Sequence, residues 1–248
     1  MNHAPDAFTM DALIAMVDSA DPDLVFTNLG DIDRVGHSDL TGSTTLDAAR
    51  TAALASTDQQ VGRFVQHLKD TGRWETSVLV VLADHSMDWS VPTGVVSLAA
   101  VLDADPLLTG RVQIAQNGGA DLLYWTGADA DRAAAVSRMR EVVGGVAGVL
   151  SSHLPADLRL GPEAGDLVVY CKAGWRFSDP AVYSNPIPGN HGHPATEPIP
   201  FFLAGGSRRV AFGAVRTDVA STVDVAPTVG QLFALPAPSG GYDGTSRL

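Results

Sequence analysis

Hydrophobic and polar positions alternate in blocks along the first third of the chain. Residues 23–29 and 77–82 are short apolar runs with the length of buried strands. Between them, apolar residues recur at helical spacing over residues 46–70, and Thr71-Gly72 is a typical helix end. A strand, a helix and a second strand in this order predict a βαβ unit with parallel strands. Residues 30–44, rich in Gly, Asp, Ser and Thr, are predicted to form a functional loop or a simple connector.

The pattern changes after residue 88. Short strands are predicted at 112–115, 121–126 and 166–171, with an amphipathic helix at 130–143. This mixture indicates a smaller α+β subdomain, distinct from the βαβ pattern that precedes it.

The remaining segments complete a core. Residues 10–17 predict a short helix, and four prolines within 185–198 predict a rigid return loop. Residues 199–204 predict a strand, and residues 224–233 predict a helix with proline near its first turn.

Together these elements predict an α/β fold. We expect a mainly parallel central sheet flanked by helices, with an inserted α+β cap subdomain. The core is assigned to residues 1–87 and 186–248, and the cap to residues 88–185.

Composition narrows the class of protein. The chain has 248 residues, 45% of them hydrophobic, which is enough for a sizeable core. Its net charge of −12 argues against non-specific nucleic-acid binding, which needs basic patches. The single cysteine, Cys171, excludes an intramolecular disulfide, and its apolar surroundings predict a buried strand residue.

Targeting signals are not evident. No apolar segment reaches the ~18 residues that a membrane-spanning helix needs. Residues 1–10 lack the charged-then-apolar pattern of a signal peptide, and the cellular location is left open.

Acidic and histidine residues follow the predicted strands. Asp33 and His37 come after the first strand, and Asp84 and His85 come directly after the second. Because the carboxyl ends of parallel strands meet at one edge of a sheet, we expect these side chains to converge. His191, in a glycine-flanked loop, is a fifth candidate. Histidine with aspartate is a ligand set for zinc, and also suits manganese or iron.

Taken alone, each of these motifs is more typical of an ordinary turn or loop than of a metal site, and only their joint occurrence favours a metal site. Asp31 is an alternative ligand to Asp33, and His193 is a weaker candidate for a site role. Asn28 and Arg34 are weaker candidates for contact with a substrate phosphate. Trp175 and Tyr183 have two interpretations, base stacking and packing, of which packing is favoured.

These motifs resemble the type I phosphodiesterase/nucleotide pyrophosphatase family of the alkaline phosphatase superfamily. The resemblance covers residues 23–248 and is weakest over 88–165. It implies that Asp33, His37 and His191 bind one metal ion. It implies that Asp84 and His85 bind a second. The matching motifs are Asp33-x-x-Gly-His37, Thr57-Asp58-x-x-Val61-Gly62, Ala83-Asp84-His85-x-Met87, Gly189-x-His191-Gly192, and Asp224-Val225-Ala226-Pro227-Thr228 followed by Gly244.

The chain departs from the family pattern at two places. Ser86 stands where the family has glycine after the Asp-His pair. The family also has an upstream strand ending in an aspartate ligand, followed by a threonine or serine nucleophile at a helix start. Only 22 residues precede the strand predicted at 23–29. We therefore expect this chain to be the C-terminal part of such an enzyme, with no catalytic nucleophile and only the first metal site complete.

The resemblance implies a metal-dependent hydrolase of phosphodiester or nucleotide pyrophosphate bonds, acting on a small phosphoester with two divalent ions, zinc first and manganese or iron as alternatives. Relatives that cleave monoesters, sulfates or phosphonates remain open. A non-catalytic metal-binding remnant is the alternative, and an unrelated α/β domain with chance motifs is a third. We also expect self-association through an exposed sheet edge.

Overall fold

The computed structural model describes residues 4–38, 48–179 and 188–248. The chain divides into two compact units. Unit 1 comprises Met1–Thr9, Phe26–Thr57 and His85–Pro198, and unit 2 comprises Met10–Val25, Asp58–Asp84 and Ile199–Leu248. None of the helices in the described ranges is long and apolar enough to cross a membrane.

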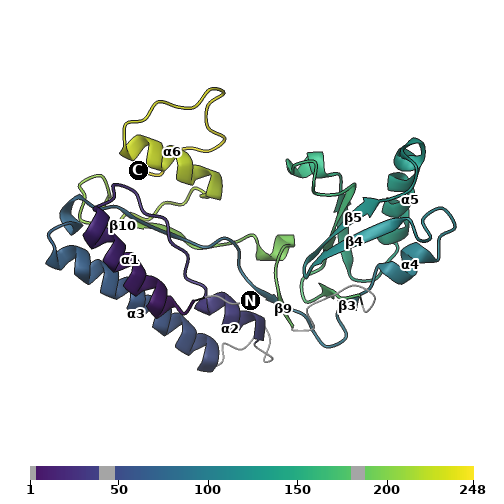
Figure 1. Ribbon diagram of the computed structural model, residues 1–248, viewed down its shortest axis with the longest axis horizontal. Coiled ribbons are helices and arrows are strands. Elements are labelled where there is room, and N and C mark those ends of the chain that lie inside the picture. Colours follow the sequence, from purple (N-terminus) through teal and green to yellow (C-terminus); the bar gives the residue numbers. More distant parts are fainter. Residues whose placement is uncertain (1–3, 39–47, 180–187) are drawn as a thin grey trace. The chain divides into compact units, whose positions relative to one another are not determined.

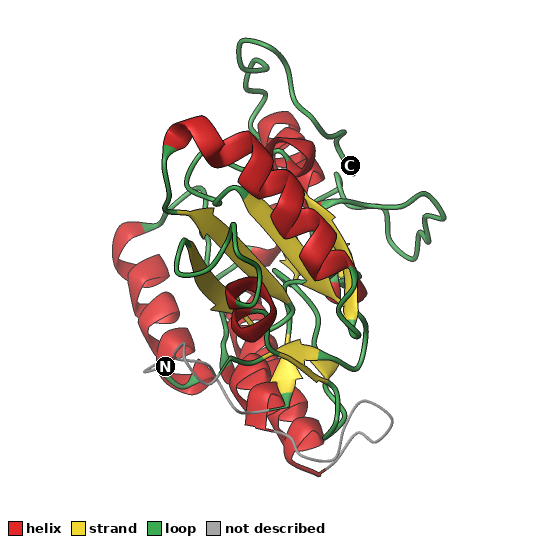
Figure 2. Cartoon of the chain, turned by 90° about the vertical axis from the view of Figure 1, so that its right-hand side faces the viewer, coloured by secondary structure: helices red, strands yellow, loops and turns green. Residues whose placement is uncertain are grey.

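Unit 1 is built on a four-stranded antiparallel sheet in the order β4-β5-β7-β6. Helix α5 (Arg132–Gly144) packs against one face of this sheet (Figures 1 and 2). Its buried residues Ala135, Met139 and Val143 are four apart, so they form one stripe. The strands are β4 (Val112–Asn117), β5 (Ala120–Trp125), β6 (Val149–His153) and β7 (Leu167–Cys171).

The sequence predicted most of this sheet. Strands β4, β5 and β7 and helix α5 are confirmed, and Cys171 is a buried strand residue whose pKa burial raises to about 12. Strand β6 was not predicted, because its two apolar residues at the start are followed by the polar residues Ser151, Ser152 and His153, so the segment lacks an apolar run. It forms by pairing with β7, whose hydrogen-bonding groups would otherwise be unpaired on that side.

Short elements connect this sheet to the rest of unit 1. Strand β2 (Asp88–Trp89) pairs antiparallel with β9 (Gly189–Asn190), and β3 (Val95–Val96) pairs parallel with β8 (Arg176–Phe177). The helical elements are α2 (Asp31–Ser38), α4 (Ala99–Asp103), η2 (Asp129–Asp131), η3 (Pro155–Leu158) and η4 (Pro194–Thr196).

Unit 2 contains a two-stranded antiparallel sheet. Strand β1 (Leu79–Leu82) pairs with β10 (Phe201–Ala204), with Leu79 opposite Ala204. Helices α1 (Asp6–Ala20) and α3 (Ala48–Asp70) are joined within this unit by the pair Arg63–Asp11, at 2.6 Å. The other helical elements are η1 (Trp74–Thr76), η5 (Thr222–Asp224) and α6 (Val225–Leu232).

Several of these elements agree with the sequence predictions, including β1, β10, α6 and α1, whose first residues belong to unit 1. The predicted end of α3 is also confirmed. Gly72 takes a φ of 72°, a conformation that side chains disfavour, and the next amide, Arg73 N, donates to Leu68 O at 2.8 Å.

The structure corrects the expectation for residues 23–29. They form neither a strand nor a helix, and Phe26 is 91% exposed. An apolar run becomes a strand only where a neighbouring strand offers hydrogen-bonding partners. Among the described residues, β3 with β8 is the one parallel pairing, so the mainly parallel central sheet is not confirmed, whereas the mixture of helices and strands is.

The expected loop at 30–44 is also corrected, as far as it is described, because residues 31–38 form helix α2. Acidic residues in its first turn and His37 in its last turn suit the helix dipole, although the composition had indicated a loop. The division into a core of residues 1–87 and 186–248 and a cap of residues 88–185 stays a prediction.

Candidate metal centre

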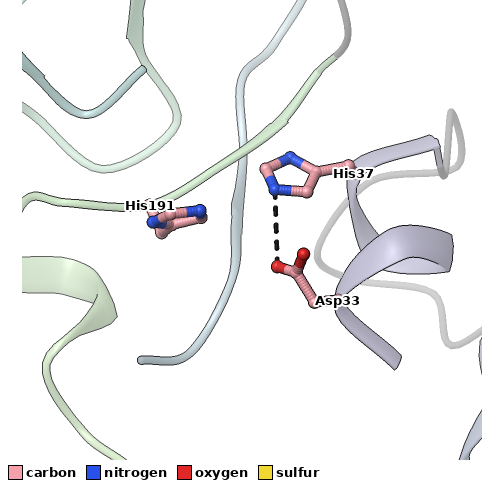
Figure 3. A group of neighbouring side chains, drawn as sticks. All are labelled: Asp33, His37 and His191. Atoms are coloured by element: carbon pink, nitrogen blue, oxygen red, sulfur yellow. Dashed lines mark ion pairs between the residues drawn. The ribbon is translucent and has the colours of Figure 1, made fainter. Parts of the chain in front are cut away.

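Helix α2 places Asp33 and His37 on one face. They are four residues apart, one helical turn, so their side chains point the same way. The His37 Nε2 atom lies 3.4 Å from the Asp33 Oδ1 atom. Figure 3 marks this ion pair with a dashed line. The sequence predicted both residues as ligands, but not the helix that brings them together.

Strand β9 fixes the orientation of the His37 ring. The ring Nδ1 lies 2.8 Å from Gly189 O, and because a carbonyl only accepts, Nδ1 carries the proton. The Nε2 lone pair is then free to bind a metal, since a histidine ligand typically donates its other N–H to a carbonyl or carboxylate.

The backbones of α2 and β9 approach closely, as Figure 1 also shows. A Cβ on Gly189 would clash with Gly36 O and lie 2.7 Å from His37 Cα, so this approach requires glycine. Trp89, in strand β2, donates from Nε1 to Gly36 O at 2.9 Å and fastens the same turn of α2.

His191 follows β9 directly and completes a group with Asp33 and His37. Each of the three residues offers one ligand atom, and these atoms all lie within 4.8 Å of one another. Figure 3 shows His191 beside the Asp33–His37 pair. His85 adjoins this group, because its ring stacks on His191 with centroids 3.5 Å apart. Its Nε2 lies 3.9 Å from Asp33 Oδ1.

The charges in the group support one another. The adjacent His37 side chain is the largest influence on the pKa of Asp33 and lowers it, against the opposing effect of burial. Electrostatic interactions with His37, His85 and His191 lower this pKa further. Asp33 in turn raises the pKa of His37, again against burial. The site therefore favours an ionised carboxylate surrounded by imidazoles.

These residues fit a divalent metal ion. Asp33 Oδ1 and His37 Nε2 are buried and have no hydrogen-bond partner, which is unusual for polar atoms. Two ligand atoms of a tetrahedral zinc ion lie about 3.3 Å apart, given zinc–ligand bonds near 2 Å. The 3.4 Å separation of Asp33 Oδ1 and His37 Nε2 matches this value.

The fifth predicted ligand, Asp84, belongs to unit 2, where it follows β1 and is exposed. Unit 1 thus collects the other four. Ser86, which replaces the family glycine, donates its backbone N–H to Thr196 O at 2.8 Å. This bond ties the chain after His85 to the loop that follows His191.

The weaker candidates have structural partners. The His193 side chain is fully buried, and its Nε2 lies 3.0 Å from Asp88 Oδ2. The Asp31 carboxylate accepts hydrogen bonds from Asp6 N and Arg34, so neither Asp31 nor Arg34 needs a site role to explain its charge. Trp175 packs against Gly148, and Tyr183 lies outside the described residues. Asn28 is exposed.

The fold is similar to that of solved phosphoesterase-type proteins. Murine ectonucleotide pyrophosphatase/phosphodiesterase 5, in an inactive form in complex with AMP, has 16% identity and a TM-score of 0.70 over 95% of this chain and 60% of that one. The human protein has 15% identity and a TM-score of 0.68 over 99% of this chain and 63% of that one. Phosphonoacetate hydrolase from Sinorhizobium meliloti 1021, in complex with phosphonoacetate, has 16% identity and a TM-score of 0.61 over 88% of this chain and 52% of that one.

At these identities the similarity concerns the fold, and this chain spans only about 60% of the length of the murine protein. No curated protein matches the sequence significantly. The sequence profile described as type I phosphodiesterase / nucleotide pyrophosphatase matches residues 3–194. This match covers well over half of the chain and confirms the resemblance inferred from the motifs. The chain belongs to the type I phosphodiesterase/nucleotide pyrophosphatase family.

Proposed function

We propose that this chain carries the metal-binding part of a metal-dependent hydrolase of phosphodiester or nucleotide pyrophosphate bonds. The observation that carries the proposal is the convergence of Asp33, His37 and His191, with ligand atoms within 4.8 Å of one another. Family membership supports hydrolytic chemistry on phosphoesters.

Asp33, His37 and His191 would hold one divalent ion, and Asp84 with His85 would contribute to a second. Zinc suits this donor set best, with manganese or iron as alternatives. A bound ion would polarise a phosphoryl oxygen and lower the pKa of a bound water toward about 7.

The chain's own residues have defined tasks in this scheme. Gly189 O holds the protonated Nδ1 of His37, which directs Nε2 into the site. The neighbouring histidines favour the anionic form of Asp33. The ring of His85 stacks on His191, which restricts the rotation of both rings.

We assign no catalytic nucleophile within this chain. The proposed substrate class is a small phosphate ester or phosphoanhydride, as suggested by family membership and by AMP, a phosphate ester, bound in one structural neighbour. Turnover is then expected to need a threonine or serine hydroxyl that this chain does not supply. The alternative is a metal-binding module of the same fold without activity.

Metal content and activity of the purified chain test the proposal. We expect bound zinc by elemental analysis, which His37→Ala should abolish and His67→Ala should not. His67 is a suitable control because it lies on α3 and pairs with Asp18 at 2.8 Å.

A chromogenic phosphodiester separates the two functional alternatives. Bound metal without turnover supports a metal-binding module that lacks its nucleophile. Turnover by this chain contradicts the assignment of no nucleophile, and absence of bound metal contradicts the proposed function itself.

A further inference from the structure

A buried carboxylate lies at the start of the helix that carries two of the proposed ligands. The Asp6 side chain is 0% exposed, and a buried carboxylate is costly unless donors surround it. Asp6 Oδ1 accepts hydrogen bonds from Gly30 N at 2.8 Å and from Asp31 N at 3.1 Å. These amides begin α2 and have no partner within that helix.

Thr57, on α3, satisfies the second oxygen of Asp6. Its hydroxyl donates to Asp6 Oδ2 at 2.5 Å. Asp6, Thr57 and the start of α2 all belong to unit 1, although the two side chains come from α1 and α3. One carboxylate therefore connects three helices at a single point.

The connection is reciprocal. Asp6 is the first residue of α1, and its own backbone N–H donates to Asp31 Oδ2 at 3.2 Å. Each helix thus begins with an aspartate whose carboxylate accepts from the first amides of the other. This arrangement fixes both the position and the direction of the start of α2.

Helix α2 depends on such fastening, because it has only eight residues. A helix of about two turns is unstable by itself in water. Its far end is held by Trp89 and Gly189, as described above, and its near end by Asp6. Asp33 and His37 lie between these points, so a shift at the near end moves both ligands.

We propose that Asp6 and Thr57 are positioning residues for Asp33 and His37, acting through the start of α2 without contacting a metal ion. The proposal rests on the metal-binding function proposed above. Loss of a group hydrogen-bonded directly to a metal ligand typically weakens binding by about 10- to 100-fold. Asp6 and Thr57 act one step further away, through the backbone of α2, so their effects should lie at the lower end of this range.

Zinc affinity of the full chain, measured by competition with a chromogenic chelator, tests the proposal. We expect Asp6→Ala to weaken zinc binding by about 10-fold or more. Asp6→Asn keeps an oxygen acceptor and should weaken zinc binding less. Thr57→Val should weaken it moderately, whereas Thr57→Ser retains the hydroxyl and should restore the wild-type affinity.

Asp11→Ala is the matched control. Asp11 also lies on α1 and also contacts α3, through Arg63, but it has no link to α2. It should lower the unfolding midpoint of the metal-free chain with no change in zinc affinity. If Asp6→Ala does the same, binding zinc normally once folded, Asp6 is merely structural and the proposal is overturned. If Asp6→Ala does not fold, the Thr57→Val and Thr57→Ser pair decides.

Hydrogen exchange of the metal-free chain distinguishes failure of this inference from failure of the proposed function. Faster exchange over residues 31–38 in Asp6→Ala, but not in Asp11→Ala, supports the positioning role. Unchanged exchange there overturns it, even if the wild-type chain binds zinc. A wild-type chain that binds no zinc instead contradicts the proposed function.

Discussion

At the residue scale, Gly189 links backbone packing to the orientation of a ligand. Its carbonyl accepts from His37, and its missing side chain lets β9 approach α2. We predict that Gly189→Ala weakens metal binding and destabilises the fold, because the new methyl group would lie 2.7 Å from His37 Cα. Metal titration and thermal unfolding measure the two effects.

Gly62→Ala is the matched control for this substitution. Gly62 lies inside α3 with nothing within 4 Å of a new methyl group. It should stabilise the chain by about 0.5–1 kcal/mol and leave metal binding unchanged. Equal behaviour of the two alanine variants would contradict the role given to Gly189.

Asp121 gives a prediction about pH. Its side chain is 0% exposed, neither oxygen has a hydrogen-bond partner, and burial followed by the charge of Asp179 raises its pKa to about 8. The unfolded chain has the ordinary value near 3.8. Because the folded pKa is the higher one, Asp121 costs no stability below about pH 4, and its cost grows as pH rises toward about 8.

Asp121→Asn should therefore stabilise the chain most near pH 8 and above, and least near pH 4. Urea unfolding across this range measures the difference. Asp105→Asn is a control of opposite sign, since Arg138 lowers the pKa of Asp105 and its contribution is lost in acid. A difference between Asp121→Asn and wild type that does not vary with pH would contradict the assignment.

The proposed metal ligands could be predicted from the sequence, but the residues that hold helix α2 in place could not. Asp33, His37, His85 and His191 stand out in the sequence because aspartate and histidine recur within a few residues of one another or beside glycine, a pattern that is visible locally. Asp6 and Trp89 do not stand out, since their partners lie 24 and 53 positions away. Nothing in a single sequence indicates such distant hydrogen bonds.

At the element scale, the spacing of apolar residues predicted buried strands and helices, whereas no pattern in the sequence predicted helices that depend on capping. Strands β4, β5 and β7 and helix α5 follow from alternating or helical spacing of apolar residues. Helix α2 was predicted as a loop, because its stability comes from caps and contacts rather than from an apolar stripe. The apolar run 23–29 was predicted as a strand, but no strand pairing forms there.

The carboxylate of Asp224 holds the C-terminal segment together, because it accepts hydrogen bonds from Ser221 N, Thr245 N and Arg247. The backbone amides of Ser221 and Thr245, then Arg247, lower the pKa of Asp224 to about 2, against the effect of burial. Because this pKa lies below the unfolded value of 3.8, the stabilisation is present above that value and is lost as pH falls toward 2.

Asp224→Asn should destabilise the chain at neutral pH and weaken its acid sensitivity, as urea unfolding at pH 7 and pH 3 would measure. Asp218→Asn should have a smaller effect, because Asp218 is half exposed and exposed ion pairs contribute little. Equal losses in the two variants would show that the carboxylate of Asp224 does not hold this segment.

At the scale of the whole molecule, exposed apolar side chains predict self-association. Phe26 is the clearest case in unit 1, and such exposure is a liability in a monomer. We expect Phe26→Asp to lower the weight-average mass measured by sedimentation at a fixed concentration. Thr27→Asp adds the same charge beside it without removing an aromatic ring and should lower the mass less. A monomeric wild-type chain would contradict this prediction.

The proposed function of the whole molecule depends on Asp33, His37 and His191 binding a metal ion together. Anomalous diffraction at the zinc absorption edge, from crystals of the zinc-loaded chain, tests it most directly. We predict an anomalous peak about 2 Å from Asp33 Oδ1, from His37 Nε2 and from a ring nitrogen of His191. Full zinc loading without a peak at these three residues, or with the peak elsewhere, would contradict the account.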